Sequence, residues 1–310
     1  METKIEFYRQ RTFSEKMNAT FDFIRQNWKV LLKYTFYLIM PICLIQTYAM
    51  NSFFASVFKL SATNDIGIIG GVEGFIANYG ILVLCYLVGS ALLSSLVYAL
   101  MKTYATRENS LHDVVFADFK DILIRDFWKI IRLLLFIILV YVVIVAIAAV
   151  LVATVSPWSL VLTIPIILAV LFGAVIISMI LPIYLFEKIT LWQALLKAWR
   201  LGITTFWGML GLMIVLYIIS SVIQTVTMMP WYILTIIGGV FSTMSGASDA
   251  SMVNAVWYKF ILYILGLVQA YGMYAASIIG VAGIAFQYFH AREKVEGVTI
   301  ESNIENFKEL

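Results

Sequence analysis

The side chains best suited to chemistry in this sequence are neutral amides that interrupt long apolar runs. An amide both donates and accepts hydrogen bonds, so in apolar surroundings it pairs with another polar group or with a polar ligand. The candidate binding residues are Gln46, Asn51, Gln224 and Gln269. Two interpretations stay open: hydrogen bonds that hold helices together, and a polar vestibule that contacts a head group or solute.

Groups that usually serve catalysis are sparse. The two histidines, His112 and His290, are expected to be ordinary exposed residues at the membrane surface, and Cys43 and Cys85 lie inside apolar runs. No motif in the sequence has the spacing of a metal site, a catalytic triad or a phosphate-binding loop. The sequence therefore predicts no enzymatic activity, no cofactor and no metal site.

Charged residues next to the apolar runs lie at the ends of those runs, where a long side chain reaches the membrane surface. They are Lys33, Lys59, Glu73, Glu187 and Lys259. Transport coupled to buried carboxylates is therefore not expected, and neither is voltage sensing.

The elements that must position the four amides are predicted to be transmembrane helices. Of the 310 residues, 62% are hydrophobic and 13% are charged, which excludes an ordinary soluble protein. About 20 apolar residues cross a bilayer as a helix. The runs of at least this length without Asp, Glu, Lys or Arg are Tyr34–Phe58, Phe75–Met101, Leu133–Phe186, Leu201–Ser248 and Phe260–Ala291.

Two of these runs contain a turn signal. The third is too long for one helix and divides at Ser156-Pro157-Trp158-Ser159, a turn with an interfacial aromatic residue. In the fourth, we expect the helix to end at Pro230-Trp231-Tyr232, with residues 230–258 as an outer loop that contains a short interfacial or re-entrant piece. The sequence thus predicts six spans.

The basic residues predict the orientation of these spans, because cytoplasmic segments carry an excess of Lys and Arg. Nineteen lie in residues 1–33, 102–132 and 188–200 and in the tail after Gln287. Lys59 and Lys259 are the two on the other side. Both termini are therefore predicted to be cytoplasmic, and we expect the protein to lie in a bacterial plasma (inner) membrane.

A short motif recurs ahead of the spans and indicates an internal repeat. Ile24-Arg25-Gln26-Asn27-Trp28-Lys29 returns as Ile124-Arg125-Asp126-Phe127-Trp128-Lys129, and a looser copy leads to Phe206-Trp207. The tryptophans Trp28, Trp128 and Trp207 are predicted interfacial anchors, since indole rings favour the membrane surface.

A helix start of one type precedes each of these tryptophans: Thr12-x-x-Glu15, Ser110-x-x-Asp113 and Thr190-x-x-Gln193. From the first start onward, apolar residues recur at helical spacing, at Phe13, Met17, Phe21 and Ile24. The fold is therefore predicted to be an all-α integral membrane domain with six transmembrane helices, built as three repeats of an amphipathic cytoplasmic helix plus a transmembrane hairpin. The predicted repeat units are residues 12–101, 110–186 and 190–289, followed by a cytoplasmic tail at 290–310.

Two further patterns concern helix packing. Gly272-x-x-x-Ala276-x-x-x-Gly280 places small residues on one helix face, where they let a neighbouring helix approach closely. Pro41, Pro165 and Pro182 lie in or at the ends of predicted spans and are expected to kink them.

With Thr20-Phe21-Asp22-Phe23-Ile24-Arg25-Gln26-Asn27-Trp28 and the later Thr190-Leu191-Trp192-Gln193-Ala194, the chain resembles a group of bacterial polytopic membrane proteins. They are related to the membrane domain that precedes some glycerophosphodiester phosphodiesterases. The resemblance implies a membrane domain of this type over nearly the whole chain. The phosphodiesterase domain is absent from this sequence, so its hydrolytic activity does not carry over.

Two functional hypotheses follow. In the first, the protein binds or transports a lipid or other amphiphile at an axial cavity lined by Gln46, Gln224 and Gln269. In the second, it is a structural or assembly partner of another membrane protein. The expected partners are membrane lipids and, under the second hypothesis, another membrane protein. Nucleic acid is not expected, because acidic residues offset much of the basic charge.

Overall fold

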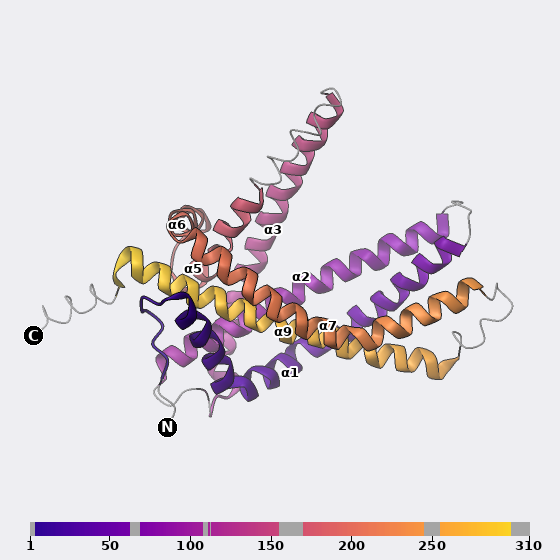
Figure 1. The fold of residues 1–310 in the computed structure, drawn as a ribbon, viewed down its shortest axis with the longest axis horizontal. Coiled ribbons are helices and arrows are strands. Elements are labelled where there is room, and N and C mark those ends of the chain that lie inside the picture. The colour runs from indigo at the N-terminus through magenta and orange to yellow at the C-terminus, as the bar shows by residue number, and fades with distance from the viewer. Residues whose placement is uncertain are drawn as a thin grey trace, which may run out of the picture. The chain divides into compact units, whose positions relative to one another are not determined.

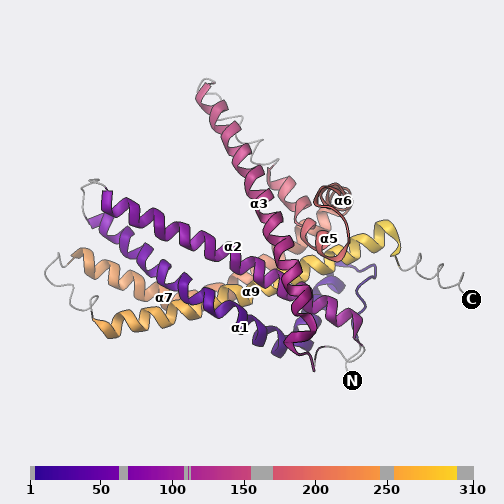
Figure 2. The same cartoon turned by 180° about the vertical axis from the view of Figure 1, so that it is seen from behind.

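The computed structural model describes residues 4–62, 69–107, 111, 113–154, 170–244 and 255–298 (Figures 1 and 2). In these ranges all regular secondary structure is helical. The chain forms two compact units, which are treated separately below. Unit 1 comprises Met1–Val30, Ser94–Leu216 and Ile279–Leu310, and unit 2 comprises Leu31–Leu93 and Tyr217–Ile278.

Five of the helices are long and apolar enough to cross a membrane. These helices are α1 (Phe13–Ala62), α2 (Ile69–Thr106), α3 (Phe116–Thr154), α7 (Phe206–Met244) and α9 (Val256–Glu296). Two short helices, α5 (Ile180–Phe186) and α6 (Leu191–Thr204), stand between α3 and α7 in the chain. The chain is therefore an all-α protein with the long apolar helices of a multi-pass membrane protein.

The predicted division of the third run lies outside the described residues, at Ser156-Pro157-Trp158-Ser159. Of the fourth predicted span, the described part is the apolar helical stretch Val170–Phe186, which is shorter than a full span. Six spans therefore stay a prediction.

The helix does not end at Pro230, as the sequence led us to expect. Instead, α7 continues through this proline to Met244, so residues 230–244 are not an outer loop. Proline removes one backbone hydrogen bond, but in an apolar environment every other backbone group still gains by staying helical. The next residue, Trp231, is buried and its indole nitrogen donates to Asn51 Oδ1 over 2.9 Å. This contact helps to hold the helix past the proline.

The predicted helix starts at Thr12 and Thr190 are confirmed, whereas the helix expected between them begins later than predicted. The Thr12 backbone N–H donates to Glu15 Oε2, and Thr190 forms a complete capping box with Gln193. The second predicted cap, Ser110, lies outside the described residues. There α3 begins at Phe116, and the Asp118 carboxylate accepts from the backbone N–H of Val115 over 2.8 Å.

The expected amphipathic helices are not all separate elements. The first two segments run on through Trp28 and Trp128 as the first turns of the long helices α1 and α3. In the third segment, α6 ends at Thr204 and α7 starts afresh at Phe206. The threefold repeat stays a prediction, with this difference between its copies.

Pro182 marks a break, as the sequence predicts. Residues 170–177 are helical, Ser178 and Met179 form a turn, and α5 resumes at Ile180. A proline ring clashes with the carbonyl four residues earlier, which here belongs to Ser178. By contrast, α1 continues through Pro41, and Pro165 lies outside the described residues.

At part of the predicted face, the small residues of α9 allow α7 to pack closely against it. In unit 2, a Cβ atom added at Gly272 would lie 2.4 Å from Thr227 Oγ1. One turn later, the Ala276 carbonyl accepts from Ser220 Oγ over 3.1 Å. Gly280, in unit 1, has nothing within 4 Å of its Cβ position. The close approach therefore involves Gly272 and Ala276 but not Gly280.

These two glycines form a matched pair for mutation. Gly272→Ala should destabilise the protein by about 1–3 kcal/mol, because the new methyl overlaps the Thr227 side chain and forces a shift. Gly280→Ala should be neutral or stabilising by up to about 1 kcal/mol, because alanine is the better helix former and its methyl meets open space. Denaturant unfolding in detergent micelles measures both values, and equal effects of the two changes would contradict this packing.

Candidate functional site

Two of the four predicted amides hold helices together within unit 2. Gln46 of α1 is 5% exposed, and its Oε1 accepts from the Tyr274 hydroxyl of α9 over 2.8 Å. The same hydroxyl lies 3.2 Å from the Cys85 carbonyl oxygen of α2. Asn51, one helical turn beyond Gln46, accepts from the Trp231 indole of α7. These contacts fit the interhelical interpretation of Gln46 and Asn51.

The other two amides have no such partner. Gln269 of α9 is buried, and its Oε1 has no hydrogen-bond partner among the described residues. The Gln224 side chain on α7 is half-buried, without a hydrogen bond to another described side chain. Neither amide lines either of the pockets described below, so the axial vestibule stays a hypothesis.

All three predicted anchors are strongly exposed. The exposed fractions are 51% for Trp28, 58% for Trp128 and 81% for Trp207. The Lys29 ammonium lies 5.8 Å from the ring centroid of Trp28, within cation–π range. Such large exposed rings suit contact with lipid at the membrane surface.

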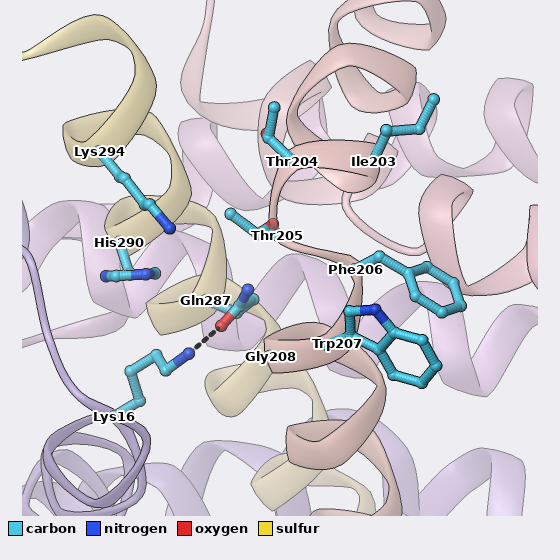
Figure 3. A pocket seen from close by; sticks show the side chains of 10 residues that line it. All are labelled: Lys16, Ile203, Thr204, Thr205, Phe206, Trp207, Gly208, Gln287, His290 and Lys294. Carbon is cyan, nitrogen blue, oxygen red and sulfur yellow. Dashed lines mark hydrogen bonds between the residues drawn. The ribbon is translucent and has the colours of Figure 1, made fainter.

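A pocket of about 230 Å³ opens beside Trp207 within unit 1 (Figure 3). It is lined by the beginning of α1, the α6–α7 connection and the last turns of α9. We call it the Lys16 pocket. Its lining residues are Lys16, Ile203, Thr204, Thr205, Phe206, Trp207, Gly208, Gln287, His290 and Lys294.

Lys16 reaches this pocket because the inward face of α1 in unit 1 is a polar stripe. Lys16, Thr20, Phe23 and Asn27 recur at helical spacing and are all buried, at 4%, 0%, 0% and 3% exposure. The apolar residues that the sequence pattern picks out are less buried than this stripe, since Phe13 is 43% exposed and Ile24 is half-buried. A helix in lipid can turn its apolar face outward and its polar face toward protein.

Gln287 and His290 enter the pocket from α9. Gln287 is 0% exposed, and its Oε1 accepts from the Lys16 ammonium over 2.8 Å. His290 Nδ1 accepts from the backbone N–H of Arg11 over 2.9 Å, so His290 is half-buried rather than freely exposed as predicted. The segment ahead of α1 is held by Phe7, whose ring stacks on Phe289 at 4.9 Å.

The pocket is electropositive. None of its ten described lining residues is an Asp or a Glu. The charged groups that lower the pKa of His290, after burial, are Lys16, Lys294 and Arg11, all of them cations. A second, smaller pocket in unit 1 differs, because its lining pairs Arg9 and Arg11 with Glu15 and Asp22.

Other charged residues of unit 1 are paired. Lys102 donates to Asp126 over 2.5 Å, and the Asp126 side chain is fully buried. Glu187 accepts from Lys197 and from the Tyr288 hydroxyl, each over 2.8 Å. The sequence predicted that Glu187 reaches outward to the membrane surface. Instead, it is part of a hydrogen-bonded network. These pairs hold helices together, whereas Lys16 has no ion pair with any described residue.

No group of three or more His, Cys, Asp or Glu that could hold a metal ion occurs among the described residues, which do not include His112. No protein-family model, curated protein or solved structure matches the chain.

Sequence reasoning found Trp207 but missed Lys16, Gln287 and Tyr274. The polar stripe of Lys16, Thr20 and Asn27 was a readable signal, because polar residues at helical spacing opposite an apolar face point to a polar interior. For Gln287 no local signal existed. Its role depends on a residue 271 positions away along the chain, to which only folding brings it close.

The amides of unit 2 provide a second matched comparison. Gln46→Met should cost about 1 kcal/mol of stability, because the Tyr274 hydroxyl loses its nearest acceptor. Gln269→Met should be neutral or stabilising, because it removes a buried oxygen that has no partner among the described residues. Both are measured as the free energy of unfolding in detergent, with binding of lipid followed in parallel. A large loss of stability in Gln269→Met would mean that this amide has a partner in the membrane.

Proposed function

We propose that this multi-pass membrane protein binds the polar head of an amphiphile, such as a lipid, in the Lys16 pocket. The observation that supports the proposal best is the combination of a positively charged pocket with strongly exposed apolar residues at its rim. With the orientation that the basic residues predict, the pocket would open at the cytoplasmic surface of a bacterial plasma membrane. The proposal assigns no reaction, cofactor or metal to the protein.

The rim suits an apolar chain. Trp207 is 81% exposed and Ile203 is 48% exposed, and both line the pocket. Trp199, one turn before Ile203 on α6, is 50% exposed. A ligand whose head lies against Lys16 could lay its chain over these residues, where burial of apolar surface adds about 25 cal/mol per Å².

Replacement of the rim tryptophan tests the proposal. We expect Trp207→Ala to lower lipid retention by roughly tenfold, which corresponds to about 1.4 kcal/mol of lost contact. Native mass spectrometry of protein purified in a mild detergent measures the bound fraction and the mass of the bound molecule. Trp192→Ala is the control, because Trp192 is also strongly exposed, at 62%, but does not line the pocket. Equal retention in both variants, or no bound amphiphile in the wild type, would refute the proposal.

A second candidate function, that of an assembly partner, is favoured by α3. Only 11% of its apolar stretch is buried, compared with 50% for α9. Lipid alone covers such a helix well, but so does a helix of another membrane protein.

Photo-cross-linking distinguishes these two coverings. A photo-reactive amino acid in place of Leu139, which is 62% exposed, should give mainly lipid adducts in native membranes under our first proposal. A discrete cross-linked protein band of defined mass would favour the assembly partner instead. The same group in place of Leu133, which is 2% exposed on the same helix, controls for reaction within the chain.

A further inference from the structure

We propose that the Lys16 pocket selects a phosphate-class oxyanion, carried either on a lipid head group or as a free phosphate. This inference rests on the proposed function in one respect, since it takes the same pocket as the binding site. It adds the chemical class of the ligand. Several hydrogen-bond donors belong to the described lining of the pocket, and none of the ten described lining residues carries a carboxylate.

The first observation is a buried ammonium without a carboxylate. Lys16 is 4% exposed, and in the described part of the chain its ammonium has one hydrogen bond, to the neutral Oε1 of Gln287. A buried lysine normally has an acidic partner, because an isolated charge is costly to remove from water. Among the described residues, the charge found to act on Lys16 is that of another cation, Lys294, so an anion bound here would supply the missing charge.

The second observation is an unpartnered amide nitrogen. Because Gln287 Oε1 accepts from Lys16, the orientation of the amide is set, and a flip would turn its NH₂ group against the ammonium. Gln287 is 0% exposed, and its Nε2 has no partner among the described residues. Figure 3 shows this nitrogen turned away from Lys16, on the side of Thr205. Buried donors of this kind are rarely left without an acceptor.

The third observation is the start of α7. Its first backbone hydrogen bond runs from the Met209 N–H to the Thr205 carbonyl, so the N–H groups of residues 206–208 come before the helical ladder. Phe206, Trp207 and Gly208 all line the pocket, and a Cβ atom added at Gly208 would lie 3.4 Å from the Lys16 ammonium. The free N–H groups and positive end of this long helix therefore adjoin Lys16 and attract an anion.

His290 adds a fourth donor. Its Nδ1 accepts from the Arg11 backbone, so the neutral imidazole carries its proton on Nε2. The pocket thus presents an ammonium, an amide, an imidazole N–H and a helix N-terminus, with no carboxylate in its described lining. A tetrahedral phosphate offers acceptors in three dimensions, whereas the lone pairs of a carboxylate lie in one plane. The pocket volume of about 230 Å³ is nearly eight times the roughly 30 Å³ that one water molecule occupies in the liquid, which leaves room for a phosphate and its ester group.

Ligand comparison with the wild-type protein in detergent tests this inference. The probes are phosphatidic acid, diacylglycerol with the same chains, and inorganic phosphate, each titrated while thermal stability and Kd are measured. We expect phosphatidic acid to bind at least tenfold more tightly than diacylglycerol, with affinity falling as salt rises. Tight binding by inorganic phosphate alone would support the phosphate site but refute the amphiphile proposal. Equal binding of phosphatidic acid and diacylglycerol would refute the phosphate site and leave the amphiphile proposal standing. Binding of none of the three would refute both.

An isosteric variant separates binding from folding. Gln287→Glu should be at least as stable as the wild type, because the new carboxylate pairs with Lys16. It should nevertheless weaken phosphatidic acid binding more than tenfold, because the pocket then holds its own anion. Lys16→Met should weaken binding to a similar extent.

Lys188→Met is the matched control, since it removes one positive charge at an exposed position outside the pocket. A Gln287→Glu variant that is stable and binds phosphatidic acid as the wild type does would overturn the inference. An equal loss of affinity in Lys188→Met would also overturn it, because it would show that general surface charge holds the ligand.

Discussion

The arrangement of this protein depends on one constraint: a polar side chain on a long apolar helix has no water nearby and must find its partner on another helix. Gln46 with Tyr274 and Asn51 with Trp231 meet this constraint in unit 2. Lys102 with Asp126 meets it in unit 1. Each bond forms only when two helices lie in one register. The few polar residues therefore determine how these mostly apolar helices pack. The individual bonds contribute little energy, but misaligned helices would leave both partners unsatisfied.

The Lys16 pocket is one place where the described residues meet this constraint only in part. Lys16 and Gln287 satisfy each other in part, while the amide nitrogen of Gln287 and the N-terminal N–H groups of α7 are left as donors. Elsewhere in unit 1, positive charges lie next to carboxylates, as in the network of Glu187 with Lys197. The excess of donors in a single place gives the pocket its affinity for an acceptor from outside the chain. Trp207 is exposed at the rim, so a surface suited to apolar chains lies next to these donors.

Pro230 and α1 show why local rules reached only part of the fold. A proline in an apolar run is a sound helix-stop signal in water, where loops are well solvated. Here the following Trp231 is buried with a hydrogen bond to Asn51, and α7 runs on past it. In α1 the spacing of the apolar residues predicts the helix, but it does not show which polar residues the helix buries. The stripe that enters the protein contains Lys16, Thr20 and Asn27, because lipid accepts the apolar face as readily as a protein core does.

The sequence alone determined that the chain is helical, apolar and multi-pass in character, because length without charge and helical period are properties of neighbouring residues. It also determined the starts of α1 and α6, since a capping box closes within four residues. The tertiary structure decided which polar groups meet. Lys16 and Gln287 are adjacent only after the two ends of the chain come together, and no local pattern encodes a contact across 271 positions. The pocket therefore exists as a consequence of packing, although each of its residues is visible in the sequence.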